Sequence, residues 1–218
     1  MVDKIIVDAL TDSNCYLLVS GNHALIVDPN DYKKIHSYLN QNALIPELII
    51  LTHEHCDHIA ALNDLRKQYP VKVLCSAACS SGIQSTTLNM TRIMETYLYF
   101  KSKGKLHISY PPFTCQAADI TFEETYRATW RQHTILCLSA PGHTPGSSCI
   151  IIDDSFLFSG DYFIPNESVI TRLPGGDENA YEKFGKPRLY SLPTPIKTYP
   201  GHGTPFVLTK EVKDAYGL

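Results

Sequence analysis

Residues 52–58 read Thr-His-Glu-His-Cys-Asp-His and hold three of the nine histidines of the chain together with two carboxylates. His53 and His55 are two positions apart, so on an extended segment both side chains can face the same way, and Asp57 and His58 follow as the chain turns. Neutral imidazoles and carboxylates are ligands that zinc accepts, with bonds near about 2.1 Å. This loop therefore predicts ligands for two neighbouring metal positions.

Three further ligand-type residues each follow a glycine at the end of a predicted strand. They are His143 after strand 134–139, Asp161 after strand 156–158 and His202 after strand 196–199. Glycine permits tight turns and close backbone approach, which helps to aim short side chains into one cleft. Three protein ligands per ion leave a position for water, which a hydrolytic site needs. The predicted metal ligands are His53, His55, Asp57, His58, His143, Asp161 and His202.

The two other polar or reactive side chains of the loop have no predicted place at a metal. We expect the Cys56 sulfur to point into the core. We expect Glu54 to be solvated or hydrogen-bonded, with a supporting role behind the ligands as the alternative. The isolated histidines receive no functional role, because a lone histidine is more often a surface or core residue; they are His23, His36, His107 and His133.

The elements that must position this loop form a strand, helix, strand unit. Short aliphatic runs at 4–8, 15–19 and 23–28, separated by turn sequences, predict an antiparallel meander. A helix at 31–40, a strand at 47–51, a helix at 59–69 and a strand at 71–74 follow. The histidine-rich loop therefore lies at the carboxyl end of a buried strand, where open α/β sheets bind ligands.

The second half of the chain repeats this plan. Runs at 119–123, 134–139, 148–152 and 156–158 predict strands, and the segment 88–100 predicts a helix. We expect one domain over residues 1–218, with a helical insertion at about 85–112 that covers the site.

Composition narrows the class of partner. Hydrophobic residues make up 44% of the 218 residues, charged residues 19%, and the formal net charge is −3. This balance is globular and argues against nucleic acid or an anionic membrane as the partner. No apolar run approaches the roughly 20 residues of a membrane helix, and the first residues lack the pattern of a signal peptide, so we expect a cytoplasmic protein. Seven cysteines without a Cys-x-x-Cys pair predict reduced thiols. The oligomeric state stays open.

The complete Thr-His-x-His-x-Asp-His motif resembles that of metallo-β-lactamase-fold hydrolases. Further stretches resemble the family in order and spacing: Asn14-Cys15-Tyr16, Asp28-Pro29, 141–146, Gly160-Asp161 and 199–203. The resemblance implies an α/β fold, the αββα sandwich of the metallo-β-lactamase type. It also implies one metal held by His53, His55 and His143, a second by Asp57, His58 and His202, and Asp161 bridging both.

Within that family the chain resembles the short form of hydroxyacylglutathione hydrolase, glyoxalase II. Asp161 at the bridging position and the Pro-Gly-Gly at 174–176 carry this likeness. The sequence departs from that branch before the Pro-Gly-Gly, where Arg172 is displaced from the usual Gly-Arg-x-Asp and the aspartate is missing. The resemblance implies two zinc ions, with iron or manganese as alternatives, and a small-molecule thioester or activated ester as substrate.

Two roles complete this prediction. Asp57 is the predicted catalytic residue, because it can orient the attacking water as well as bind metal. Arg172 and Tyr162 are the predicted substrate-binding residues, within the variable segments 90–112 and 162–188. A thioester suits the site because a thiolate leaves without the general acid that an amide nitrogen needs.

Three alternatives remain. The first is a mononuclear iron oxygenase of the persulfide dioxygenase kind, which would use one metal position as a facial triad. The second is a binding module without catalysis, and the third is a β-lactamase or lactonase. Metal content and a substrate panel separate these four functions.

Overall fold

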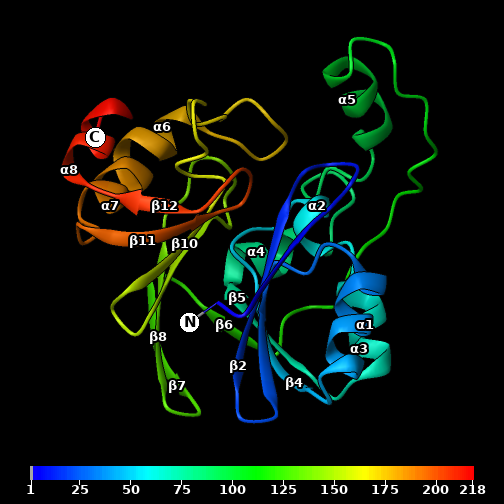
Figure 1. Ribbon diagram of the computed structural model, residues 1–218. Coiled ribbons are helices and arrows are strands. Elements are labelled where there is room, and N and C mark those ends of the chain that lie inside the picture. The colour runs from blue at the N-terminus through cyan, green and yellow to red at the C-terminus, as the bar shows by residue number, and fades with distance from the viewer. Residues whose placement is uncertain (1) are drawn as a thin grey trace.

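The computed structural model describes residues 2–218 and contains two six-stranded sheets packed face to face, with helices on both outer faces (Figure 1). The predicted αββα sandwich is therefore confirmed. Each sheet has the other sheet on its inner face and helices on its outer face, which explains why so many strands are apolar at consecutive positions.

The first sheet has the strand order β1-β2-β3-β4-β5-β6. The three N-terminal strands pair antiparallel, as predicted, and β3 to β6 pair parallel. The elements of this half are β1 (Lys4–Val7), β2 (Asn14–Ser20), β3 (His23–Val27), α1 (Tyr32–Gln41), β4 (Ile45–Ile50), α2 (Cys56–Ile59), α3 (Leu62–Gln68), β5 (Lys72–Ser76), α4 (Ala77–Gly82), α5 (Met94–Lys101) and β6 (Ile120–Phe122).

The second sheet has the order β12-β11-β10-β9-β8-β7, in which only β10 and β11 pair parallel. Its helices follow β10 and cover the outer face on the left in Figure 1. The elements are β7 (Thr125–Trp130), β8 (His133–Ser139), β9 (Ser148–Ile152), β10 (Phe156–Gly160), α6 (Glu178–Ala180), the π-helix η1 (Tyr181–Gly185), α7 (Lys186–Tyr190), β11 (Ile196–Pro200), β12 (Phe206–Leu208) and α8 (Lys210–Ala215).

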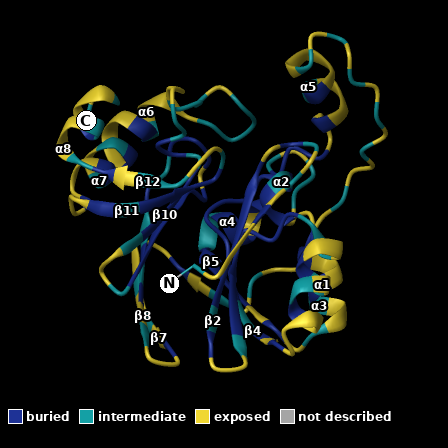
Figure 2. Cartoon of the chain, in the orientation of Figure 1, coloured by how far each residue is buried: buried dark blue, intermediate teal, exposed yellow. Residues whose placement is uncertain are grey.

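Strand β2 shows how the core is divided. Tyr16 and Leu18 point into the cluster between the sheets, whereas Cys15 and Leu17 point into the cluster under the outer helices, as period-2 alternation requires. Figure 2 accordingly shows the central strands of both sheets as buried and the outer sides of the helices as exposed. All seven cysteines are buried and unpaired.

Two predictions about elements need correction. The helix predicted at 59–69 is two helices, because the N–H of Ala61 donates to the Pro29 carbonyl at 3.0 Å where the chain changes direction. The helix predicted from residue 88 begins only at Met94, because Met90 has a φ of 66°, which an α-helix cannot contain. Strand β7 and the helices after β10 had no counterpart in the sequence analysis.

The helices of the described residues 2–218 are all too short or too polar to cross a membrane.

Candidate metal centre

The loop after β4 is held from both sheets. Thr52 donates its N–H and its hydroxyl to the two carboxylate oxygens of Asp28, at 2.7 and 2.6 Å. The carbonyl of Thr52 accepts from the N–H of Ser148, at the start of β9 in the second sheet, at 2.8 Å. These bonds fix the direction of the residues that follow, 53–58.

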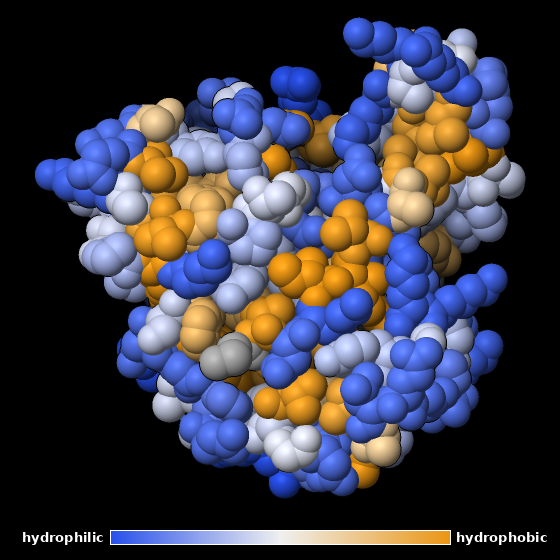
Figure 3. All heavy atoms as spheres, viewed as in Figure 1, coloured by the Kyte–Doolittle hydropathy of each residue, from blue (hydrophilic) through white to orange (hydrophobic). Residues whose placement is uncertain are grey.

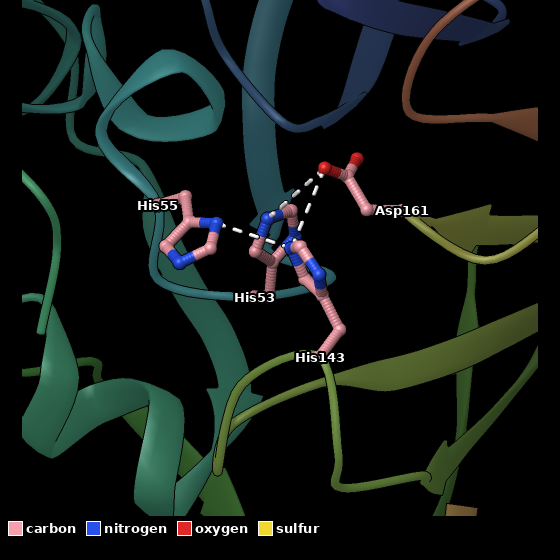
Figure 4. A group of neighbouring side chains, drawn as sticks. All are labelled: His53, His55, His143 and Asp161. Atoms are coloured by element: carbon pink, nitrogen blue, oxygen red, sulfur yellow. Dashed lines mark hydrogen bonds and ion pairs between the residues drawn. The ribbon is translucent and has the colours of Figure 1, made fainter. Parts of the chain in front are cut away.

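The first group of ligand-type side chains lies at this point and comes from three strand ends (Figure 4). One ligand atom from each of its four members lies within 4.8 Å of the others. His143 Nε2 lies 3.1 Å from His55 Nδ1 and 3.4 Å from Asp161 Oδ2, and His53 Nε2 lies 4.0 Å from the same carboxylate oxygen. Three histidines and one carboxylate therefore converge on one point.

The second group consists of Asp57, His58 and His202. Asp57 Oδ2 lies 3.8 Å from His58 Nε2 and 3.4 Å from His202 Nε2. Asp161 also faces this group, with Oδ1 at 3.3 Å from His58 Nε2 and Oδ2 at 3.6 Å from His202 Nε2. The carboxylate of Asp161 therefore stands between the two groups.

The donor atoms fit metal ions. The Nε2 atoms of His53 and His58 and Oδ1 of Asp161 are buried without a hydrogen-bond partner among the described residues, and His55 faces His143 Nε2 with its Nδ1. Buried polar atoms are normally paired, because desolvation without a partner costs free energy. Ions between the two groups would supply the partners that most of these atoms lack.

The outer ring nitrogens are occupied, as is typical of histidines that bind metal. His58 Nδ1 lies 3.1 Å from Asp28 Oδ2, His143 Nδ1 lies 2.7 Å from the Ile170 carbonyl, and His53 Nδ1 lies 3.1 Å from the Thr52 hydroxyl. Because these three partners accept hydrogen bonds, each Nδ1 carries a proton, and each Nε2 faces the cluster.

Burial keeps the three histidines of the first group neutral. Desolvation lowers the pKa of His53 and His143 below the usual value for histidine, and it lowers the pKa of His55 to about 3. Imidazoles with such pKa values are uncharged at pH 7, which is the form that binds metal. Burial alone would raise the pKa of Asp161, but the neighbouring His202 and His58 hold it well below the usual value.

Gly201 shows how closely the strand ends approach one another. Its N–H donates to the Gly160 carbonyl at 2.7 Å, and its own carbonyl accepts from the N–H of Asn14 at 2.7 Å. A Cβ atom at Gly201 would overlap Asp161 Oδ1. Any side chain at this position would therefore displace the carboxylate between the two groups.

Two residues of the Asn14-Cys15-Tyr16 stretch support the loop that carries His202. The Asn14 amide donates to the carbonyls of Pro200 and Gly203 at 3.0 and 2.8 Å, and the Tyr16 hydroxyl also donates to Pro200. The sequence analysis quoted this stretch only as a family likeness. A polar Asn at the start of an otherwise apolar strand was the available signal.

Glu54 is not solvated, contrary to one of our two expectations. Its side chain is 0% exposed and accepts hydrogen bonds from the Thr144 hydroxyl at 2.9 Å and the Gly146 N–H at 3.3 Å. Burial raises its pKa to about 7. Glu54 therefore ties the loop at 52–58 to the loop that carries His143. Cys56 is buried, as expected, and packs against Met90 and Met94.

The structure places Tyr162 behind the cluster and not in the cleft. Tyr162 is 1% exposed, and its hydroxyl donates to the Ala140 carbonyl at 2.6 Å and accepts from the His143 N–H at 3.2 Å. A side chain used in this way cannot contact substrate, so we withdraw that prediction. The direction in which a residue after a strand end points is decided by packing. Arg172 is exposed and lies outside the residues that line the cleft.

A cleft of about 280 Å³ opens onto the two groups. Its floor includes His55, Asp57, His143, Asp161 and His202, and its walls come from α5 and the segment 164–173. A larger hollow of about 770 Å³ lies beside it, between residues 165–171 and α8, but contains none of the seven ligand-type residues. The chemistry therefore belongs to the smaller cleft.

Residues 9–202 match the family described as the Metallo-beta-lactamase superfamily. The probable metallo-hydrolase YqgX of Bacillus subtilis is 29% identical over 196 residues, which are 88% of this chain and 85% of that protein. A hydroxyacylglutathione hydrolase of Pectobacterium atrosepticum is 40% identical over 70 residues, which are 32% of this chain and 28% of that enzyme. The second likeness is thus confined to a short segment.

Solved structures share nearly the whole fold. The BLEG-1 B3 metallo-beta-lactamase has a TM-score of 0.76 and 25% identity, over 95% of this chain and 94% of that chain. TTHA1623 in a di-iron-bound form has a TM-score of 0.72 and 26% identity, over 94% of each chain.

Proposed function

The chain belongs to the metallo-beta-lactamase superfamily, and from this premise we propose that it is a hydrolase with two metal ions that cleaves a thioester or activated ester of a small molecule. The observation that carries the proposal is Asp161, whose carboxylate lies between two groups of ligand-type side chains, the first buried and the second partly exposed. His53, His55 and His143 would hold one ion and Asp57, His58 and His202 the other, with Asp161 shared.

Ions at these positions would supply Lewis acidity, which lowers the pKa of a water from about 15.7 toward 7 and polarises the substrate carbonyl. The chain itself supplies orientation. The Asp57 side chain is 15% exposed on the cleft floor and can accept a hydrogen bond from the attacking water. The attacking water gives one proton to solvent as its oxygen bonds to the acyl carbon, the carbon–sulfur bond breaks, and the thiolate leaves with the bonding electrons. The carboxylic acid product then loses its remaining proton to solvent.

Zinc is the metal we propose, because histidine and carboxylate ligands suit it. Iron and manganese are the alternatives, and the di-iron form of the related TTHA1623 supports iron. The short match to hydroxyacylglutathione hydrolase supports a thioester resembling that of glyoxalase II. Arg172 remains the proposed contact for the thiol carrier, because it is exposed and lies between Ile170 and Leu173 of the cleft wall.

The test combines metal analysis with a substrate panel. We expect close to two ions per chain, and hydrolysis of at least one member among lactoylglutathione, acyl-coenzyme A, a lactone and a β-lactam. The thioesters should be cleaved fastest. Two ions without hydrolysis of any thioester or ester would contradict the proposal, and preference for the β-lactam would change the substrate class.

The oxygenase alternative has one observation in its favour. The first group is more deeply buried than the second, since His53, His55 and His143 are at most 3% exposed whereas the His202 side chain is 17% exposed. The first group could thus hold a single ion while the second stays empty. One iron per chain, with oxygen uptake on addition of a persulfide, would establish this function in place of hydrolysis.

A further inference from the structure

The cleft above the metal centre has an apolar wall on the side of α5. Met90, Met94, Tyr97 and Leu98 line it. Met90, Met94 and Leu98 are at most 3% exposed, so that they present only a small part of their surface to the cleft, whereas Tyr97 is partly exposed. They belong to one cluster with Cys56, which lies within the metal-binding loop itself. The apolar surface therefore begins directly beside the proposed reaction centre. Figure 3 shows apolar side chains gathered over the α5 segment at the upper right.

The opposite wall is also apolar. It comes from the segment after β10 and contains Ile164, Pro165, Ile170 and Leu173. Leu173 packs against the α5 cluster, so the two walls meet at this residue. The segment that follows Leu173 also lies close to residues before α5, since a Cβ atom at Gly175 would lie 3.3 Å from the Leu88 side chain. The cleft is thus closed along one side by apolar groups.

Charged groups outside the metal cluster do not favour an anion in the cleft. They are the carboxylates of Asp12 and Glu167 and the ammonium group of Lys101. Lys101 Nζ lies 5.9 Å from the centre of the Tyr97 ring, at the exposed end of the wall. With two carboxylates and one ammonium group, these residues do not form the cationic pocket that binding of a carboxylate or phosphate group requires.

From these walls we infer that the cleft selects its substrate by an apolar acyl chain, seated between α5 and the opposite wall of Ile164, Pro165 and Ile170 with Leu173 closing one side, while the thiol or alcohol carrier stays at the mouth. This inference rests on the proposed hydrolysis and adds the substrate class. Each buried methylene group contributes about 0.8 kcal/mol, so specificity rises about fourfold per methylene. The limited volume, about 280 Å³, sets an upper limit on chain length. A short hydroxylated acyl group such as lactoyl gains little from these walls.

The experiment uses thioesters of the uncharged carrier N-acetylcysteamine with acetyl, butyryl, hexanoyl, octanoyl and lactoyl groups. We expect kcat/KM of the metal-loaded protein to rise about fourfold per methylene from acetyl to hexanoyl, and to be lower for lactoyl than for butyryl. Calorimetric titration with non-hydrolysable ketone analogues of the same chains gives a second readout, in which affinity should rise in the same order.

A pair of tyrosines on α5 provides variant and control. Tyr97→Ser removes an aromatic face from the cleft and should reduce the hexanoyl to acetyl ratio at least threefold. Tyr99→Ser removes an exposed tyrosine that does not line the cleft and should leave this ratio unchanged. Leu173→Ala tests the opposite wall, so the inference does not depend on the folding of one variant.

The outcomes separate the two proposals. Hydrolysis with no dependence on chain length, or with lactoyl preferred to butyryl, would overturn the inference and leave the hydrolase in place. Affinity that rises with chain length without turnover of any ester would overturn the hydrolase and retain the apolar cleft. If the hexanoyl to acetyl ratio of kcat/KM is the same in Tyr97→Ser, Leu173→Ala and Tyr99→Ser, then α5 and Leu173 do not select the acyl chain.

Discussion

The ligand-bearing edge of the sandwich and the wall of the cleft are built differently. At the edge, the proposed ligands follow strand ends and are held by groups from both sheets, such as Asp28, Ser148 and Asn14. The wall consists of α5 and the segment 164–173, which belongs to no helix or strand. An edge that is held by both sheets keeps the ligands in one arrangement for one reaction. A wall outside regular secondary structure can instead differ in shape according to the substrate.

The largest effect should follow from removing a proposed ligand at the edge. Asp57→Ala should lower kcat by about 10² to 10⁴, because it removes the group that orients the attacking water, and should leave the first group able to hold an ion. Metal content and initial rates on the preferred thioester measure both. His133→Ala, at a histidine paired with Asp153 far from the cluster, is the control. Parent activity in Asp57→Ala would show that the nucleophile is oriented by another group.

His143→Ala should act on metal content as well as on rate. The first group loses one of its three histidines, so we expect less than two ions per chain after dialysis, with the ion of the second group retained more strongly. Elemental analysis measures this result. Two tightly held ions in the variant would mean that His143 is not a ligand, and the division into two groups would have to be redrawn.

The support behind the edge should give a moderate effect. Tyr162→Phe removes the hydroxyl that joins Ala140 to His143 and leaves a buried N–H and a buried carbonyl unpaired, which costs about 1–3 kcal/mol of unfolding free energy. Urea denaturation of the metal-free protein measures it. Tyr126→Phe, on the exposed strand β7, should change little. A raised KM at unchanged stability would instead indicate that Tyr162 contacts the substrate.

A change beside the cleft wall should affect binding and not the chemical step. Arg172→Ala should raise KM for a thioester of an anionic carrier about three- to tenfold at constant kcat, because an exposed ion pair contributes about 1 kcal/mol. Steady-state kinetics with glutathione and N-acetylcysteamine thioesters distinguish the carriers. Arg127→Ala, on the outer strand β7, is the charge-matched control. An unchanged KM would show that Arg172 does not contact the carrier. A fall in kcat would show that the segment around Arg172 also affects the chemical step at the ligand-bearing edge.

The smallest effect is expected at the end of the sandwich away from the cluster. Glu47 of β4 accepts hydrogen bonds from Arg131 and Trp130 beside β7, and the Arg131 hydrogen bond lowers the Glu47 pKa. A lowered folded-state pKa means that this stabilisation is present above the unfolded value, about 4.3, and is lost as pH falls through the folded value. Glu47→Gln should therefore cost about 1 kcal/mol or less at pH 7 and less still at pH 3.

Urea midpoints at the two pH values measure the Glu47 effect, and hydrolysis rates serve as the reference. Activity should be unchanged, because Glu47 lies outside the cleft. A loss of activity at constant stability would show that the two ends of the sandwich are coupled.

The family resemblance of the sequence supplied the fold class, and the residues themselves determined the strand, helix, strand unit around the motif and the position of the ligand-type residues at strand ends. The last two are local properties. Aliphatic runs of strand length predict buried strands, and glycine beside His143, Asp161 and His202 marks turns at their ends. That these residues come close together was decided by the packing of the two sheets, since β4 belongs to one sheet and β8, β10 and β11 to the other.

Only the tertiary structure decided which side of the site each neighbouring residue serves. Tyr162 directly follows Asp161, yet its hydroxyl supports His143 from behind, and Glu54, between two proposed ligands, is buried against Thr144. These directions depend on packing between residues about 20 and 90 positions apart, which no local pattern records. The same holds for the apolar wall, because Leu173 reaches α5 only once the second sheet has closed over the first.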